Sequence, residues 1–102
     1  SLGGVCAYIG KVRNDQLGAI FRHDMRAVGV RFDTASAEEG PATASCLVMI
    51  TPDGERTMAT YLGACAHVTE ADISADTIRA AAIVYVEGYL WDQPAAKAAI
   101  RK

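Results

Sequence analysis

The sequence lacks the features that mark several classes of protein. It has only three cysteines, an odd number without Cys-x-x-Cys spacing, so we expect no disulfide framework, no zinc or other metal site and a cytoplasmic location. Its longest strictly apolar runs, 46–50 and 80–86, are far shorter than the roughly 20 residues that span a bilayer, so no membrane partner is expected. Its ten Lys and Arg residues are scattered and the net charge is −2, so no basic face for nucleic acid accumulates.

The apolar content is sufficient for one small folded unit. The chain has 102 residues, of which 51% are hydrophobic and 22% charged, and this composition excludes disorder of the highly charged kind. Large core side chains are few, because there are only two Phe and one Trp. The chain starts at Ser1 directly before a strand-like segment, and its last helix has no capping Gly and no evident surface to cover. We therefore interpret residues 1–102 as a single partial domain.

Periodicity and turn residues predict an α/β fold. The expected order is a strand over 5–12, a helix from Asp15 to Gly29, a β-hairpin over 43–62, a short helix after Thr69, a strand over 83–86 and a last helix that Asp92 caps. The strand over 83–86 is apolar at consecutive positions, which is typical of a strand covered on both faces in a parallel sheet. We expect residues 30–63 to form a β excursion and 64–102 to return to the α/β core.

The candidate chemistry leaves alternatives open. Glu87 follows the predicted buried strand, where open α/β sheets bind ligands, but a carboxylate there can equally cap a backbone N–H. Arg56 can point a cation at a phosphate or lie solvated beside Glu55. Cys65 next to His67 can form a nucleophile pair or pack as a small apolar residue. The residue types alone specify no reaction.

Several motifs, in order along nearly the whole chain, resemble the ribokinase or pfkB-type carbohydrate kinases, in particular the adenosine-kinase-like and sugar-kinase branch. They are Tyr8-Ile9-Gly10-Lys11-Val12, Asn14-Asp15, Leu17-Gly18, Gly29-Val30, Pro41-Ala42-Thr43, Asp53-Gly54-Glu55-Arg56-Thr57, Leu62-Gly63-Ala64 and Glu87-Gly88-Tyr89-Leu90. The resemblance implies a partial ribokinase-like (Rossmann-like) sheet with helices, and a β-hairpin lid that covers the sugar.

The resemblance also implies a function for the parent protein, which would use ATP and magnesium to phosphorylate a hydroxyl of a sugar or nucleoside. Carried over by motif, the residues that would contact or border the substrate are Thr43, Ala44, Cys46, Glu87 and Tyr89, with Arg56 near the phosphate.

The chain departs from this family where catalysis is concerned. The family's Gly-Ala-Gly-Asp motif, which supplies the base and the phosphate donors, has no counterpart here, and the Gly-Gly-Asn substrate segment is also absent. Arg13 and Cys65 replace a common Gly and Asn. We therefore expect no catalytic residue in this chain, no activity on its own and no tight binding of ATP. The alternatives are a non-catalytic assembly module that self-associates as a homodimer through the lid, and a separate chain that supplies the missing half.

Overall fold

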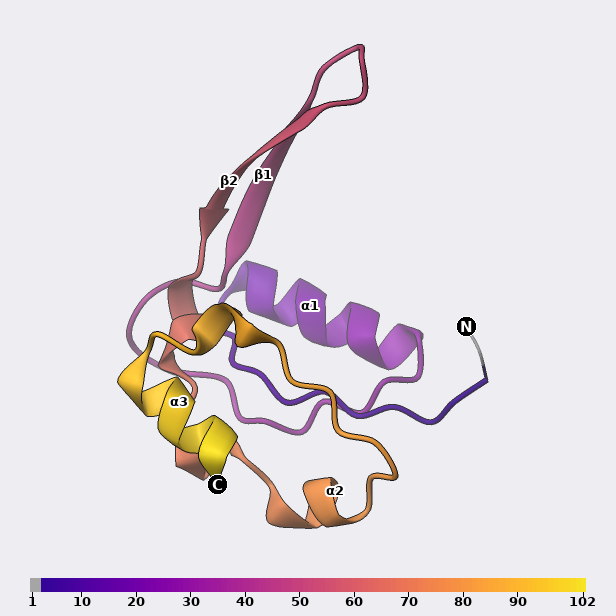
Figure 1. The fold of residues 1–102 in the computed structure, drawn as a ribbon, viewed down its shortest axis with the longest axis vertical. Helices are drawn as coiled ribbons and strands as arrows, with labels where there is room; N and C mark the ends of the chain where they lie inside the picture. The colour runs from indigo at the N-terminus through magenta and orange to yellow at the C-terminus, as the bar shows by residue number, and fades with distance from the viewer. Residues whose placement is uncertain (1–2) are drawn as a thin grey trace.

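Residues 3–102 are described by a computed structural model, whose first third is a helix between two extended segments (Figure 1). The extended segments 5–13 and 30–37 run parallel and are joined by α1 (Gln16–Ala27). They meet at two isolated bridges, Ala7 with Arg31 and Arg13 with Ala37. The predicted first strand is therefore present as an extended segment that pairs only near its two ends. A helix that joins two parallel segments is the basic unit of α/β proteins, and the predicted fold class is confirmed.

Both ends of α1 follow from local sequence signals. Asp15 is the N-cap, and its side chain accepts the Gly18 N–H. After the C-cap Val28, Gly29 adopts a positive φ of 78°, which glycine tolerates without strain. Tyr8, Phe21 and Phe32 pack α1 against both extended segments, with ring centroids 5.2 to 5.7 Å apart.

A two-stranded antiparallel hairpin projects from this body (Figure 1). It consists of β1 (Ser45–Ile50) and β2 (Arg56–Tyr61), in a register that pairs Ser45 with Tyr61 and Ile50 with Arg56. Every residue of both strands is exposed. The predicted hairpin is confirmed, and since its strands stay exposed within residues 3–102, its orientation depends on its base.

The remainder of the chain consists of short helical elements. They are η1 (Gly63–His67), η2 (Glu70–Asp72), α2 (Ala75–Arg79), η3 (Gly88–Leu90) and α3 (Pro94–Arg101). The short helix predicted after Thr69 begins with a capping box, in which Thr69 and Asp72 each bond to the other's backbone N–H. Contrary to expectation, α3 does cover a surface: it packs on η2 and η1 and buries Ala96 and Ala99. Its N-cap is Gln93 rather than Asp92.

The prediction of a buried strand over 83–86 is wrong for this chain. These residues form no strand, and Ile83 and Tyr85 are 87% and 82% exposed. Within residues 3–102, no backbone group of 83–86 forms a hydrogen bond. A strand requires a hydrogen-bonded neighbour, and an apolar run becomes buried only when other elements cover it. Neither is provided by the described part of the chain.

An ion pair connects the N-terminal segment to the second half. Lys11 Nζ lies 2.9 and 2.8 Å from the two carboxylate oxygens of Asp72 in η2. Across residues 3–102, none of the helices has the length and apolar character that a bilayer crossing requires.

Candidate functional site

One carboxylate joins the base of the hairpin to the start of α1. Asp15 Oδ1 accepts hydrogen bonds from the Gly18 N–H at 2.8 Å and from the Thr43 hydroxyl at 2.6 Å, and Oδ2 accepts the Thr43 N–H at 2.9 Å. The Thr43 hydroxyl in turn accepts the Arg13 N–H at 2.9 Å. These hydrogen bonds, those from Thr43 foremost, hold the pKa of Asp15 below its usual value. The carboxylate is therefore ionised at neutral pH.

The segment that follows β2 returns to the base of the hairpin, beside Ala42. Gly63 has a positive φ of 49°, and a Cβ at this position would overlap the carbonyl oxygen of Ala42. The Ala64 N–H donates to that carbonyl at 2.8 Å. Residues 42–43 are therefore bound to α1 on one side and to the outgoing strand on the other.

A second group of polar side chains lies beside the N-terminal segment. Burial raises the pKa of the Tyr8 hydroxyl, and the neighbouring Cys65 and Glu87 raise it further. Burial also raises the pKa of the Cys65 thiol. The Tyr85 hydroxyl donates to Glu87 Oε1 at 3.4 Å. This group combines hydroxyl, thiol and carboxyl side chains, a combination suited to hydrogen bonding with a hydroxyl-bearing ligand.

The predicted site residues fall in three places. Thr43 is 6% exposed at the hairpin base, with Ala44 half-buried next to it. Cys46 and Arg56 lie on one face of the hairpin, since Cys46 and Ile50 are an even number of residues apart and Ile50 pairs with Arg56. Four residues of strand, about 14 Å, separate their positions along the hairpin.

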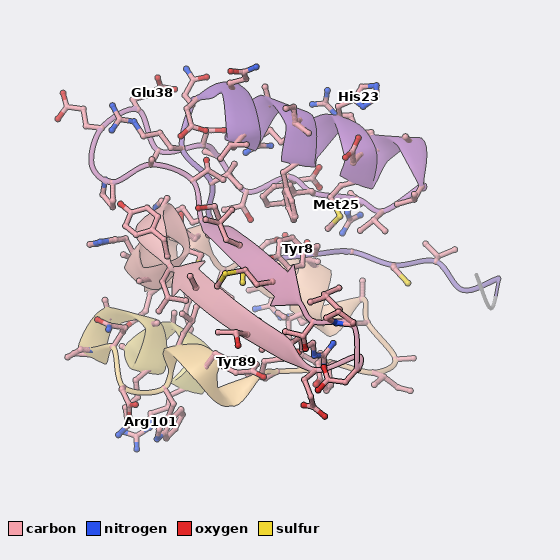
Figure 2. All side chains as sticks on the ribbon, turned by 90° about the horizontal axis from the view of Figure 1, so that it is seen from above. Tyr8, His23, Met25, Glu38, Tyr89 and Arg101 are labelled. Atoms are coloured by element: carbon pink, nitrogen blue, oxygen red, sulfur yellow. The ribbon has the colours of Figure 1, made fainter. Side chains whose placement is uncertain are left out.

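Glu87 and Tyr89 belong to the body, at the start of η3. Figure 2 shows Tyr8 and Tyr89 on different segments, and the Tyr89 side chain is 82% exposed. Glu87 and Cys65 each contribute to the raised pKa of Tyr8, while Arg56 lies at the hairpin end that is farthest from the body. The roles of these residues toward a substrate stay predictions.

Sequence reasoning missed two members of this arrangement. Tyr8 stood inside an apolar run and was counted as part of a strand, and Asp15 was assigned only as a helix cap. The contact between Asp15 and Thr43 joins residues 28 positions apart, which no local pattern reveals. The only signals for these two residues in the sequence were their places in the family motifs, Tyr8 in Tyr8-Ile9-Gly10-Lys11-Val12 and Asp15 in Asn14-Asp15.

A hollow of about 230 Å³ lies between segments 7–9, 31–35 and 71–77, and Tyr8 is part of its lining. Its polar lining includes Arg31, which pairs with Asp33 at 3.1 Å and donates to the Thr77 hydroxyl at 3.1 Å. None of the predicted site residues borders it. Within residues 3–102, no cluster of three or more His, Cys, Asp or Glu side chains is arranged to hold a metal ion.

Comparison with known proteins defines the class of this fold. A solved adenosine kinase from Sinorhizobium meliloti is 52% identical and superposes with a TM-score of 0.92 over 98% of this chain and 31% of its own. A structure described as Ribokinase II from E. coli, solved with ATP and Mg²⁺, is 24% identical, with a TM-score of 0.84 over 98% of this chain and 32% of its own. The fold is that of the ribokinase-like α/β kinases.

The family follows from sequence. The model of the pfkB family of carbohydrate kinases matches residues 1–102, and the chain belongs to this family. Fructokinase-2 from Solanum habrochaites is 31% identical over 86 residues, which are 82% of this chain and 26% of that relative. The chain thus spans about a quarter of the length of this relative, and the resemblance stated from the motifs is confirmed.

Proposed function

We propose that this chain is the lid-bearing, substrate-side portion of an ATP-dependent kinase that phosphorylates a hydroxyl group of a sugar or nucleoside. The observation that carries the proposal is the hairpin itself, exposed along its whole length and fixed at its base beside α1. A hairpin of two strands buries too little surface to be stable alone, so its exposed apolar face is suited to covering something else. Membership of the pfkB family of carbohydrate kinases supports the phosphate acceptor as the group that the hairpin would cover.

The substrate side of this site combines the hairpin with the body. Cys46 and Arg56 share the hairpin face that would close over a ligand, with Ala44 and Thr43 at its base. Glu87, which already accepts a hydrogen bond from the Tyr85 hydroxyl, would accept hydrogen bonds from ligand hydroxyls, and Tyr89 would border the same crevice. Relatives named as a fructokinase and an adenosine kinase support a sugar or a nucleoside as the acceptor.

The nucleotide and the catalytic base would come from the rest of the kinase. Phosphoryl transfer needs a group that receives the hydroxyl proton and donors for the phosphate charge, and this chain has no Gly-Ala-Gly-Asp motif to provide them. ATP and Mg²⁺ are the expected cofactors of the complete enzyme, as the related fold solved with both supports. We infer that the 102-residue chain alone is inactive and that it works in the cytoplasm.

A phosphorylation assay tests the proposal. The full-length polypeptide that carries these residues is incubated with labelled ATP, Mg²⁺ and fructose, ribose or adenosine, and the 102-residue chain is assayed in parallel. We expect transfer to at least one acceptor by the full-length polypeptide and none by the chain. Glu87→Gln should raise the acceptor KM, whereas Glu55→Gln in the hairpin turn serves as the matched control. Absence of transfer to every acceptor contradicts the kinase proposal.

One observation favours self-association as a second role. Leu47 and Ile50 on opposite faces of the hairpin are 73% and 70% exposed, so each face presents apolar area that a second copy can cover. Sedimentation velocity at increasing concentration separates the two roles. A homodimer through the hairpin should weaken in Leu47→Lys or Ile50→Lys and should not depend on sugar or nucleoside, whereas a substrate lid alone leaves the protein monomeric.

A further inference from the structure

The orientation of the hairpin depends on its base, where Thr43 forms hydrogen bonds with Asp15 and Arg13. Thr43 is the one polar residue that is buried among residues 3–102. A buried hydroxyl must be paired, and this one donates to Asp15 and accepts from the Arg13 N–H. Its own N–H donates to the second oxygen of the same carboxylate. Thr43 therefore has a single position relative to α1.

The surroundings leave this contact little freedom. At Gly18, in the first turn of α1, a Cβ would overlap the Arg13 carbonyl and would lie 3.1 Å from Thr43 Oγ1, so the helix approaches the lid base closely. At the start of η1, just after β2, Gly63 allows the same close approach to Ala42. Six residues of strand reach about 20 Å, so a rotation of roughly 10° at the base would move the tip by about 3.5 Å.

We propose that the Asp15–Thr43 contact is a positioning lock, which fixes the angle of the lid hairpin on α1 and thereby sets the affinity of the enzyme for its phosphate acceptor. Asp15 and Thr43 are positioning residues in this scheme, because they act through the hairpin that they hold. The kinetic part of the proposal rests on the proposed function, whereas the geometric part stands on the contacts alone.

Three substitutions separate the lock from general stability. Thr43→Val keeps the shape and removes the hydroxyl, and Thr43→Ser restores the hydroxyl. Asp15→Asn retains a good helix cap but replaces one acceptor oxygen with a donor, so the cap survives while the second bond to Thr43 is lost. Asp53→Asn in the hairpin turn is the matched control, because it makes the same chemical change on the lid but away from its base.

The geometric readout is a distance between the hairpin tip and α1. Spin labels are attached at Glu55→Cys and His23→Cys in the full-length polypeptide, with Cys6, Cys46 and Cys65 replaced by alanine. We expect a narrow distance distribution for the unsubstituted base, Thr43→Ser and Asp53→Asn, and a distribution at least twice as wide for Thr43→Val and Asp15→Asn. Equal widths in Thr43→Val and Thr43→Ser would overturn the lock, whatever the activity.

The kinetic readout uses the full-length polypeptide with its native cysteines. Thr43→Val and Asp15→Asn should raise the KM for the acceptor at least tenfold and leave the KM for ATP within twofold, and Thr43→Ser should recover most of the acceptor affinity that Thr43→Val loses. A purely structural role would lower the amount of active enzyme and move neither KM. A broadened distribution with an unchanged acceptor KM overturns the proposal, and a broadened distribution without any phosphorylation overturns the proposed function but not the lock.

Discussion

Lys11 and Asp72 form the least exposed ion pair in the part of the chain that the structure describes. Their side chains are 19% and 10% exposed, and Asp72 also accepts hydrogen bonds from the N–H and hydroxyl of Thr69. Burial by itself raises the pKa of Asp72, but the hydrogen bonds from Lys11 and Thr69 together outweigh it, so the pKa lies below the usual value. One carboxylate thus holds both the N-terminal segment and the capping box of η2.

Replacing Asp72 by Asn should therefore destabilise the protein in a pH-dependent way. At pH 7 we expect a loss of about 1–3 kcal/mol, because Lys11 is left without its partner. A lowered pKa in the folded state stabilises the protein above the unfolded value of about 3.9, and this contribution disappears as the pH falls through the folded pKa. The difference between the two proteins, measured by urea unfolding, should shrink below about pH 4.

The matched control is Asp76→Asn, since Asp76 pairs with Arg79 on an exposed surface. Such pairs contribute about 0–1 kcal/mol, so this variant should unfold almost like the original at every pH. An equal loss in both variants would contradict the role assigned to Asp72.

Gly63 and Gly54 provide a second comparison at single residues. Both have positive φ, 49° and 86°, but only at Gly63 would a Cβ overlap another backbone atom, the Ala42 carbonyl oxygen. Alanine in this conformation costs about 1 kcal/mol or more at either position. Gly63→Ala should lower the melting temperature clearly more than Gly54→Ala. The added Cβ at position 63 would push the backbone there away from Ala42, whereas the one at position 54 meets no neighbouring atom. Equal melting temperatures would show that the base is not tightly closed.

At the scale of elements, α3 is held by small side chains. Ala96 and Ala99 are 1% and 3% exposed where α3 packs on η1 and η2, whereas Ala95 in the same turn is exposed. Leucine at position 96 adds volume where none is free, and we expect a destabilisation of about 1–3 kcal/mol. Ala95→Leu should change stability by less than about 0.5 kcal/mol in the same denaturant experiment. If Ala96→Leu is equally harmless, α3 does not pack tightly.

The elements differ in how far the sequence predicts them, and the reason is physical. The helix from Asp15 and the hairpin around Pro52-Asp53-Gly54 form from signals within the segment itself, and both are confirmed. Burial of 83–86 depends on elements that other residues must supply, and the run alone cannot say whether they are present. The helix at Pro94 was predicted correctly, but its packing against η2 and η1 joins distant residues and had no local signal.

At the scale of the whole molecule, the candidate site also combines features that the sequence predicts with contacts between distant residues that it does not. The motif order along the chain predicted the family, which is confirmed, whereas the role of the hairpin as a lid stays a prediction. The contact between Asp15 and Thr43 and the effect of Glu87 on the pKa of Tyr8 arise only when the N-terminal segments and the later segments come together. Such side-chain contacts between distant residues require the three-dimensional arrangement.

The exposed run 83–86 should differ in amide exchange between this chain and a larger kinase that contains it. Its apolar side chains face solvent and its amides lack backbone partners within residues 3–102, so these amides should exchange with deuterium nearly as fast as in an unfolded chain. If the chain is part of a larger kinase, the remainder supplies the neighbouring strands and covers, and exchange at 83–86 should slow by about a hundredfold or more in the full-length polypeptide. The amides of β1 and β2 are the internal control, because their hydrogen bonds lie within the hairpin and should be protected similarly in both. Fast exchange at 83–86 in both proteins would mean that no larger sheet forms around this segment.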